Sequence, residues 1–251
     1  MHEVSISQLW NRAWDLFKVN WLLLLGLLVV AIIVSLIPLI GALIVGSLLW
    51  PAVIGALIAG ILLMPALVRA GYLVARQGQS SFREAFGDIS LLLKVLVYYL
   101  IMELIPGILI GFMYMPVLGS AIPGLSGASM EGGYGGMRGS ITVFSGTEVI
   151  LLWVGYILIY ILIFILNLFG WAGPYAILSG RAGIFGAIGQ SFSLTGRNFG
   201  TVFLGLLSYI GLAILGSLLC GVGLLVVVPM SYVFWPLLYL ALTGEEGASH
   251  S

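Results

Sequence analysis

Long apolar runs alternate with short polar segments along this chain, and their lengths set the expected architecture. A helix that crosses the hydrocarbon core of a bilayer needs about 20 mostly apolar residues. Six runs have about this length, at residues 20–38, 51–75, 90–112, 149–172, 199–218 and 221–243. The pattern predicts an all-α, polytopic transmembrane helix bundle with about six spans.

The segments between these runs complete the expected topology of a single transmembrane domain over residues 1–251. The expected order is an interfacial helix (1–19), the first three spans (20–112), a Gly-rich external loop (113–148), the last three spans (149–243) and a tail (244–251).

Two of the connections between spans can be interpreted in two ways. Residues 38–51 are apolar and bracketed by prolines, which interrupt helices, so a short re-entrant turn is expected there rather than a solvated loop. The last two spans meet near residues 220–223 without a polar linker, so one long kinked segment is the alternative to two helices.

The region before each odd-numbered span repeats one pattern, an apolar stripe at helical spacing. Such stripes predict short amphipathic helices lying on the membrane surface. Before the third span, Ser81 and Glu84 have the spacing of a capping box. Before the fifth span the stripe is weaker, formed by Phe185, Ile188 and Phe192. The expected interfacial anchors are Trp10, Trp14, Phe17, Phe82 and Phe86.

The even-numbered spans share a second feature, a proline toward their ends. Pro65, Pro174 and Pro236 occupy this place, and Pro106 interrupts the third span. All four prolines are expected to kink their helices. The chain therefore reads as three units, each an amphipathic interfacial helix followed by a helical hairpin with a kinked return.

Composition supports the membrane assignment. Apolar residues make up 61% of the chain and charged residues only 7%, against about 25% in a soluble domain. Net charge is zero, so no electrostatic field would gather nucleic acid.

Basic residues give the expected orientation, because cytoplasmic loops keep an excess of Lys and Arg. With six spans and a cytoplasmic N-terminus, only Arg138 falls outside. This pattern predicts a multi-pass protein of the cell membrane with both termini cytoplasmic. The residues at or near the cytoplasmic face are Arg12, Lys18, Arg69, Arg76, Arg83, Lys94, Arg181 and Arg197.

The chain resembles a group of poorly characterised prokaryotic six-span membrane proteins. They include domains of unknown function related to the membrane region of glycerophosphoryl diester phosphodiesterases. The resemblance rests on residues 13–21, AWDLFKVNW, on their echo at 194–199, LTGRNF, and on the proline-containing returns. It implies the six-span topology and no phosphodiesterase activity, because the phosphodiesterase domain is absent here.

One carboxyl group inside a predicted span is the first candidate for function. Glu103 lies about 12 residues into the third span, roughly 18 Å deep at 1.5 Å per residue. It could relay protons or cations, with Pro106 freeing the carbonyl of Met102 as a further ligand. The simpler interpretation, which we favour, is a hydrogen-bonded carboxyl that joins two helices through a tyrosine or Asn167.

The other polar candidates favour structural roles. Arg69 is expected to reach lipid headgroups rather than a substrate, and Asn167 to join helices. Small residues spaced four apart at 55–59, 56–60 and 107–111 permit close helix contact within one chain or between copies. The loop at 116–147 is by default a flexible cover, and contact with a neighbouring copy is the alternative.

No constellation for catalysis is present. The two histidines are His2 and His250, and Cys220 is the single cysteine, so neither a metal cluster nor a His-based nucleophile site can form. Glu245 and Glu246 are expected to be solvated charges in the tail. No enzyme activity, cofactor or metal is predicted.

Two classes of function remain. A transporter or channel for polar solutes needs several polar groups at membrane depth, and few are present. A membrane-organising protein needs small-residue seams and interfacial anchors, and these are abundant. We therefore expect a non-enzymatic, homo-oligomerising component whose partners are membrane lipids and copies of itself. The alternative is a channel or transporter for an ion, small solute or lipid, with Glu103 as relay.

Overall fold

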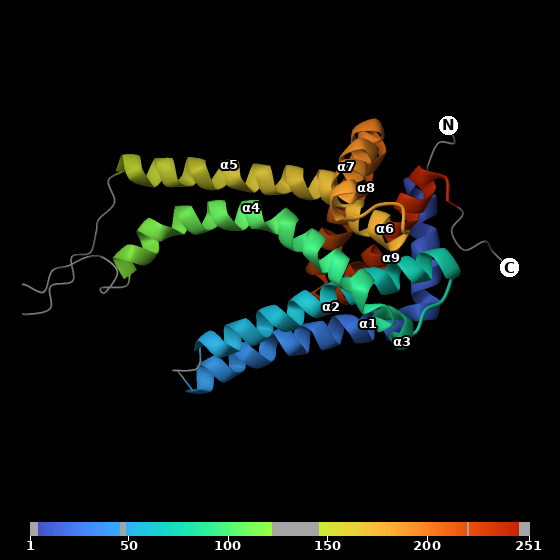
Figure 1. The fold of residues 1–251 in the computed structure, drawn as a ribbon, viewed down its shortest axis with the longest axis horizontal. Coiled ribbons are helices and arrows are strands. Elements are labelled where there is room, and N and C mark those ends of the chain that lie inside the picture. The colour runs from blue at the N-terminus through green and yellow to red at the C-terminus, as the bar shows by residue number, and fades with distance from the viewer. Residues whose placement is uncertain (1–4, 46–48, 122–145, 220, 246–251) are drawn as a thin grey trace, which may run out of the picture. The chain divides into compact units, whose positions relative to one another are not determined.

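The computed structural model describes residues 5–45, 49–121, 146–219 and 221–245, and the regular structure in these ranges is helical (Figure 1). Helices suit a bilayer because they satisfy their backbone hydrogen bonds internally. The elements in chain order are α1 (Ile6–Val45), α2 (Leu49–Gln77), α3 (Phe82–Phe86), α4 (Ile89–Ala121), α5 (Gly146–Gly170), α6 (Gly173–Leu178), α7 (Ile184–Arg197), α8 (Phe199–Leu218) and α9 (Leu224–Thr243).

Several of these helices are long and apolar enough to cross a membrane. Length and composition identify five within the described residues: Ile6–Val34, Ile89–Leu109, Trp153–Leu178, Phe199–Leu218 and Leu224–Thr243. The chain is therefore a polytopic, membrane-embedded helical protein, as its apolar pattern predicts. A sixth span in α2 stays a prediction.

The boundary between the last two spans is a true helix break. Helix α8 ends at Leu218 and α9 begins at Leu224, so the alternative of one kinked segment is wrong. Gly221 takes a left-handed conformation (φ 78°) in the turn, which glycine adopts without steric cost. Gly216 and Gly223 lie so close that a Cβ added to Gly223 would come within 2.5 Å of the Cα of Gly216.

The helices extend further into the predicted connections than expected. Helix α1 continues through Pro38 to Val45 and α2 begins at Leu49, so a re-entrant turn over all of 38–51 is wrong. Pro51 lies in the first turn of α2, where its missing N–H breaks no bond. Helix α4 continues through Pro116 and Gly119 to Ala121, and such residues are tolerated in helices of membrane proteins. The predicted loop 113–148 is thus helical at both ends, and its residues 122–145 lie outside the described structure.

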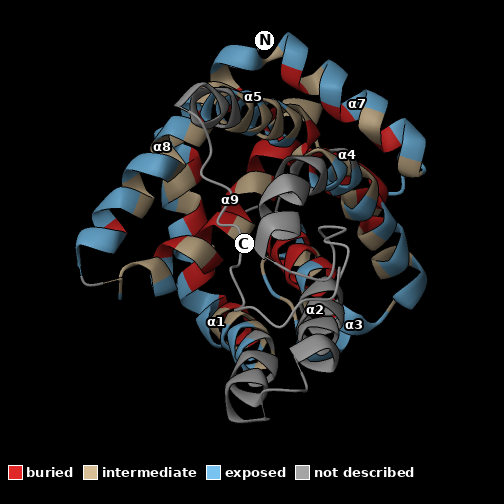
Figure 2. Ribbon diagram, turned by 90° about the vertical axis from the view of Figure 1, so that its left-hand side faces the viewer, coloured by how far each residue is buried: buried red, intermediate tan, exposed pale blue. Residues whose placement is uncertain are grey.

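Contacts divide the chain into two compact units. The first comprises Met1–Tyr99 and Leu168–Ser251, and the second comprises Leu100–Asn167. The first unit holds the core, and α9 lies at its centre in contact with α1, α2 and α8. Of the residues in the most apolar part of α9, 61% are buried, against 17–28% in the other four spans. Figure 2 shows this concentration of buried residues in red.

Close backbone contact joins α2 to α9 within this core. Gly71 of α2 lies against the backbone carbonyl of Tyr232, and any Cβ at position 71 would overlap that carbonyl. A glycine here lets the two helix axes approach, as small residues do in membrane proteins generally.

A polar residue stands at the start of the first span inside α1, between α7 and α8, and between α3 and α4. Asn20 has non-helical torsion angles (φ −110°, ψ 15°) inside α1, at the predicted boundary between 1–19 and 20–38. Asn198 takes a similar conformation (φ −124°, ψ 31°) between α7 and α8. Asp88 stands between α3 and α4, where its Oδ1 accepts a hydrogen bond from the Leu91 amide at 3.1 Å. The three units therefore share one kind of break.

The two asparagines also make the same hydrogen bond. Nδ2 of Asn20 donates to the carbonyl of Leu16 at 2.9 Å, and Nδ2 of Asn198 donates to that of Leu194 at 3.0 Å. Each carbonyl lies four residues earlier in the chain, and the Leu194 carbonyl also accepts from the Asn198 amide at 3.1 Å. This shared geometry supports the internal repeat inferred from residues 13–21 and 194–199.

The short helix α3 has the predicted capping box. Oγ of Ser81 accepts from the Glu84 amide at 3.3 Å, and Oε2 of Glu84 accepts from the Ser81 amide at 2.8 Å. Two amides that would lack helical partners are thus satisfied.

We expect Asn20→Ala to lower the free energy of unfolding by about 1–3 kcal/mol. Asn20 is buried, and besides Leu16 it bonds the Gly78 carbonyl (2.9 Å) and the Ser80 amide (3.3 Å), so alanine would leave these backbone groups unsatisfied. Thermal unfolding in detergent measures the change, with exposed Asn11→Ala on the same helix as control. Equal unfolding midpoints for the two variants would contradict this role.

Candidate functional site

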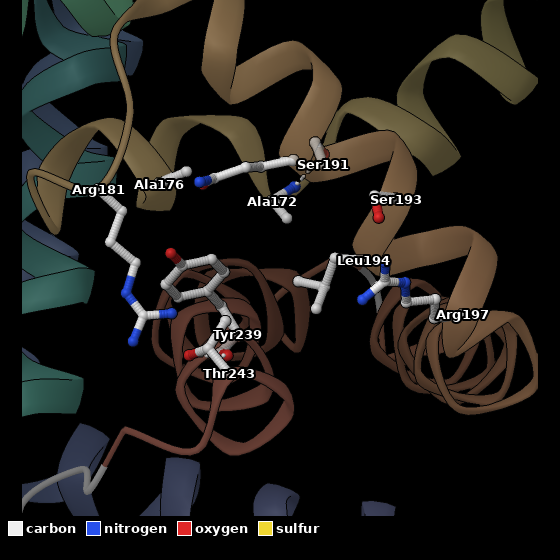
Figure 3. Close-up of a pocket in the computed structure, with 10 residues that line it drawn as sticks. Ala172, Ala176, Arg181, Ser191, Ser193, Leu194, Arg197, Tyr239 and Thr243 are labelled. Atoms are coloured by element: carbon white, nitrogen blue, oxygen red, sulfur yellow. Dashed lines mark hydrogen bonds between the residues drawn. The ribbon is translucent and has the colours of Figure 1, made fainter.

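A pocket of about 170 Å³ lies between α6, α7 and α9, inside the first unit, and brings arginine and hydroxyl side chains into a largely apolar lining. Figure 3 shows Arg181 and Arg197 on opposite sides of it, with Tyr239 and Thr243 of α9 between them. The volume is far above the ~15 Å³ that a cavity needs to hold a water molecule. The lining residues are Ala172, Ala176, Arg181, Gln190, Ser191, Ser193, Leu194, Arg197, Tyr239 and Thr243.

The turn after α6 places Arg181. Gly180 is left-handed (φ 76°), its amide bonds the Ile177 carbonyl at 3.0 Å, and the Arg181 amide bonds the Ala176 carbonyl at 3.2 Å. These are the two bonds of a Schellman motif, which ends a helix and turns the chain away.

A similar cap at the end of α9 places the partner of Arg181. Gly244 is left-handed (φ 71°), and the Glu245 amide bonds the Leu240 carbonyl at 3.0 Å. Nε of Arg181 and Oε1 of Glu245 then meet at 2.7 Å, with the Glu245 side chain only 18% exposed. The prediction that Glu245 is a solvated tail charge is therefore wrong, because its helix cap turns it back toward a cation.

Helix α7 has two polar faces with different uses. Buried Ser191 accepts from the Ala172 amide at 3.0 Å and donates to the Phe169 carbonyl at 2.6 Å. Buried Thr195 accepts from Nε1 of Trp171 at 3.0 Å. These bonds satisfy the backbone and indole groups where α5 ends and α6 begins. They also hold α7 against that turn.

The other polar face of α7 points donors toward the pocket. Gln190, Ser193 and Arg197 recur at i, i+3 and i+7, which places them on one side of a helix. The three side chains make no hydrogen bond or ion pair within the part of the chain that the structure describes.

Tyr239, which α9 contributes to the pocket, belongs to a cluster of three tyrosines. Each tyrosine comes from the returning part of one repeated unit. The ring centroids of Tyr72 and Tyr175 lie 6.4 Å apart, and those of Tyr175 and Tyr239 lie 5.8 Å apart. The Tyr239 hydroxyl lies 3.2 Å from Oγ of Ser179. Thr243 donates to the Tyr239 carbonyl at 2.9 Å, so its hydroxyl proton is used within α9.

This arrangement favours an oxyanion as ligand. The walls supply two guanidinium groups, an amide and hydroxyls, and planar guanidinium groups bind carboxylate and phosphate oxygens well. Among the described residues, no group of three His, Cys, Asp or Glu side chains could hold a metal ion. The expectation that no metal or cofactor is used stays a prediction.

The predicted polar candidates lie elsewhere. Arg69 donates from Nη1 to the Asp88 carbonyl at 3.0 Å, so it ties α2 to the turn before α4. Glu103 and Asn167 belong to the second unit. Nδ2 of Asn167 bonds the Ile163 carbonyl of its own helix at 3.0 Å. Glu103 is exposed and makes no hydrogen bond with a described residue, so the helix-joining bond expected for it is not observed.

The predicted kink residues occupy two kinds of place. Helices α2, α4 and α9 continue through Pro65, Pro106 and Pro236. Pro174 instead lies in the first turn of the separate helix α6, a position that proline favours. It begins a new helix rather than bending a longer one.

The predicted interfacial anchors also divide. Trp14, Phe82 and Phe86 are exposed large apolar side chains, as contact with lipid would require. Phe17 is buried, and Trp10 stacks on Phe234 of α9 with centroids 3.9 Å apart. Nε1 of Trp10 also donates to Oγ of Ser208 at 2.7 Å, so this tryptophan joins α1 to α8 and α9.

The pocket residues were not predicted as a site. Arg181 entered the sequence analysis only through its charge, and Arg197 through its charge and the echo at 194–199. The i, i+3, i+7 spacing of Gln190, Ser193 and Arg197 was a readable signal. The approach of Arg181 depends on the caps of two helices distant in sequence, which no local pattern shows.

Comparison with protein-family models, with curated proteins and with solved structures gave no match, so the resemblance to six-span families stays a prediction.

Proposed function

We propose that the chain is a non-enzymatic integral membrane protein that associates with copies of itself and organises the surrounding bilayer. The observation that carries the proposal is a stripe on the outer side of α8. Its members recur at intervals of three or four residues, the spacing of one helix face, and all are exposed. They are Gly200, Leu204, Leu207, Gly211, Ile214 and Leu218.

The stripe is distinct from the face of α8 that packs within the chain. Buried Gly205 and Gly216 face α9, where added Cβ atoms would touch Phe234 and the backbone of Gly223. Around Gly200 and Gly211 nothing lies within 4 Å of an added Cβ. Each of the two sides of α8 thus has its own pair of glycines, and among the described residues only Gly205 and Gly216 pack against another segment.

Exposed glycines favour a second helix over lipid as the neighbour. Glycine costs about 1 kcal/mol of helix propensity relative to alanine and offers lipid little surface. Between helices it lets two backbones approach closely and gain van der Waals contact. Two large apolar residues follow each glycine along the α8 stripe, which suits interdigitation with a second copy.

Other surfaces with small residues fit the same proposal of self-association. Gly107 on α4 is exposed, with open space around it. The small residues at 55–60 and most of the loop at 116–147 lie outside the described side chains, and self-contact through them is part of the proposal. The proposal also includes a location in the cell membrane and cytoplasmic termini, which the distribution of basic residues supports.

We expect Gly211→Leu to weaken self-association at least tenfold, about 1.4 kcal/mol, because leucine would hold the two backbones apart. Mass photometry in nanodiscs and sedimentation in detergent measure the oligomer. Gly189→Leu, at an exposed and open position on α7, is the matched control. A compact monomer for the wild type at every concentration would refute the proposal.

A second candidate function rests on Glu103. This carboxyl lies in an apolar span without a bond to any described residue, and intramembrane ionisable groups commonly serve ion or proton pathways.

If Glu103 relays protons or cations, proteoliposomes will carry a flux that Glu103→Gln removes. Asp15→Asn is the control, because Asp15 is an exposed carboxylate paired with Lys18 at 2.8 Å. Flux no greater than that of protein-free liposomes would exclude the relay.

A further inference from the structure

We propose that the pocket between α6, α7 and α9 binds the phosphate group of an anionic membrane lipid, with Arg197 as its principal cationic contact. The proposal concerns a ligand site and does not depend on self-association through α8, whose exposed stripe lies on a different element.

Unused donors are the first observation. Gln190, Ser193 and Arg197 together present an amide, a hydroxyl and a guanidinium to one cavity, and none has a partner among the described residues. A phosphate offers several acceptor oxygens to such a set, and guanidinium groups bind phosphate bidentately.

The charge balance of the pocket is the second observation. Glu245 compensates Arg181 through the 2.7 Å ion pair. Arg197 approaches from the other side and has no such partner in the described chain (Figure 3). The described residues around the pocket thus leave one positive charge uncompensated, which suits a ligand with a single negative charge.

The position of the pocket along the helices is the third. Arg181 follows the span Trp153–Leu178 by three residues, Arg197 precedes Phe199–Leu218 by two, and Thr243 is the last residue of Leu224–Thr243. The pocket therefore lies at the ends of three spans, where lipid headgroups meet a membrane protein. Basic pockets between transmembrane helices at this level bind anionic headgroups.

Exposed aromatic side chains on the helices that flank the pocket favour a lipid over a free anion. Phe185, Phe192 and Phe199 are exposed on α7 and at the start of α8. Phe192 and Phe199 both pack on Phe169, with centroids 5.3 and 6.4 Å away. Aromatic side chains are enriched at the membrane interface, so these residues support a position of α7 at the level of the lipid headgroups.

The test uses delipidated full-length protein in detergent, titrated with short-chain phosphatidylglycerol and, separately, with zwitterionic phosphatidylcholine. Native mass spectrometry measures binding. Arg197→Gln is compared with Arg83→Gln, an exposed arginine on α3 that also lacks a described partner. Arg197 is the better position to change than Arg181, because loss of Arg181 would leave Glu245 unpaired. Unfolding midpoints without lipid show whether each variant is folded.

We expect phosphatidylglycerol to bind more tightly than phosphatidylcholine, and Arg197→Gln alone to weaken it about tenfold. Arg197→Lys should retain part of the affinity. A further titration with inorganic phosphate identifies the source of the ligand. Weak competition supports a lipid headgroup, whereas phosphate binding that equals lipid binding and needs Arg197 would overturn the lipid assignment. Equal affinity of the Arg197→Gln and Arg83→Gln variants would overturn the site itself.

Discussion

A break in a helix leaves backbone N–H and C=O groups without helical partners, and the need to satisfy these groups organises the first unit. Asn20 and Asn198 each donate a side-chain hydrogen bond to the carbonyl four residues earlier, at the point where the helix breaks. Tyr98 donates to the Gly170 carbonyl at 2.6 Å where α5 ends, and Ser191 bonds both sides of the same turn. Polar residues in this apolar chain thus serve first to satisfy the backbone.

These bonds also join segments that are distant in sequence. Asn20 connects α1 to the connection after α2, and Tyr98 connects α4 to the end of α5. Gly173 makes the latter contact possible, because any Cβ there would overlap the Tyr98 ring. The hydrogen bonds that satisfy the helix breaks therefore also fix the packing of segments within the first unit.

The same geometry brings the ends of the helices together. The returns of the three units meet at Tyr72, Tyr175 and Tyr239, and the caps that follow α6 and α9 pair Arg181 with Glu245. The pocket forms beside this pair, with a second arginine supplied by α7. Lipid binding would then use the few charged residues at the helix ends, whereas self-association would use the small residues along α8.

Much of this architecture follows from local patterns. Hydrophobic run lengths predicted the membrane class and the bounds of α8, and Ser81 and Glu84 predicted the cap of α3. Helix ends at residues 38–51 and 113–121 were missed because an apolar environment lets a helix continue where a soluble one would stop.

The candidate site was harder to predict, because it depends on contacts between distant segments. Trp10 reads as a membrane anchor from its spacing, yet its partner Phe234 lies more than two hundred residues away in the chain. Arg181 and Glu245 are likewise brought together only by tertiary structure. Exposed Trp14 and Phe82, in contrast, follow from local periodicity alone.

The most direct test of this account is the free energy of unfolding, in one detergent, of Ser191→Ala and of Ser193→Ala. Both remove one hydroxyl from α7, but Ser191 is buried with two backbone bonds, whereas exposed Ser193 has none. The account predicts that Ser191→Ala costs about 1–3 kcal/mol more than its neighbour. Equal stabilities would contradict the claim that satisfied helix breaks hold this fold together.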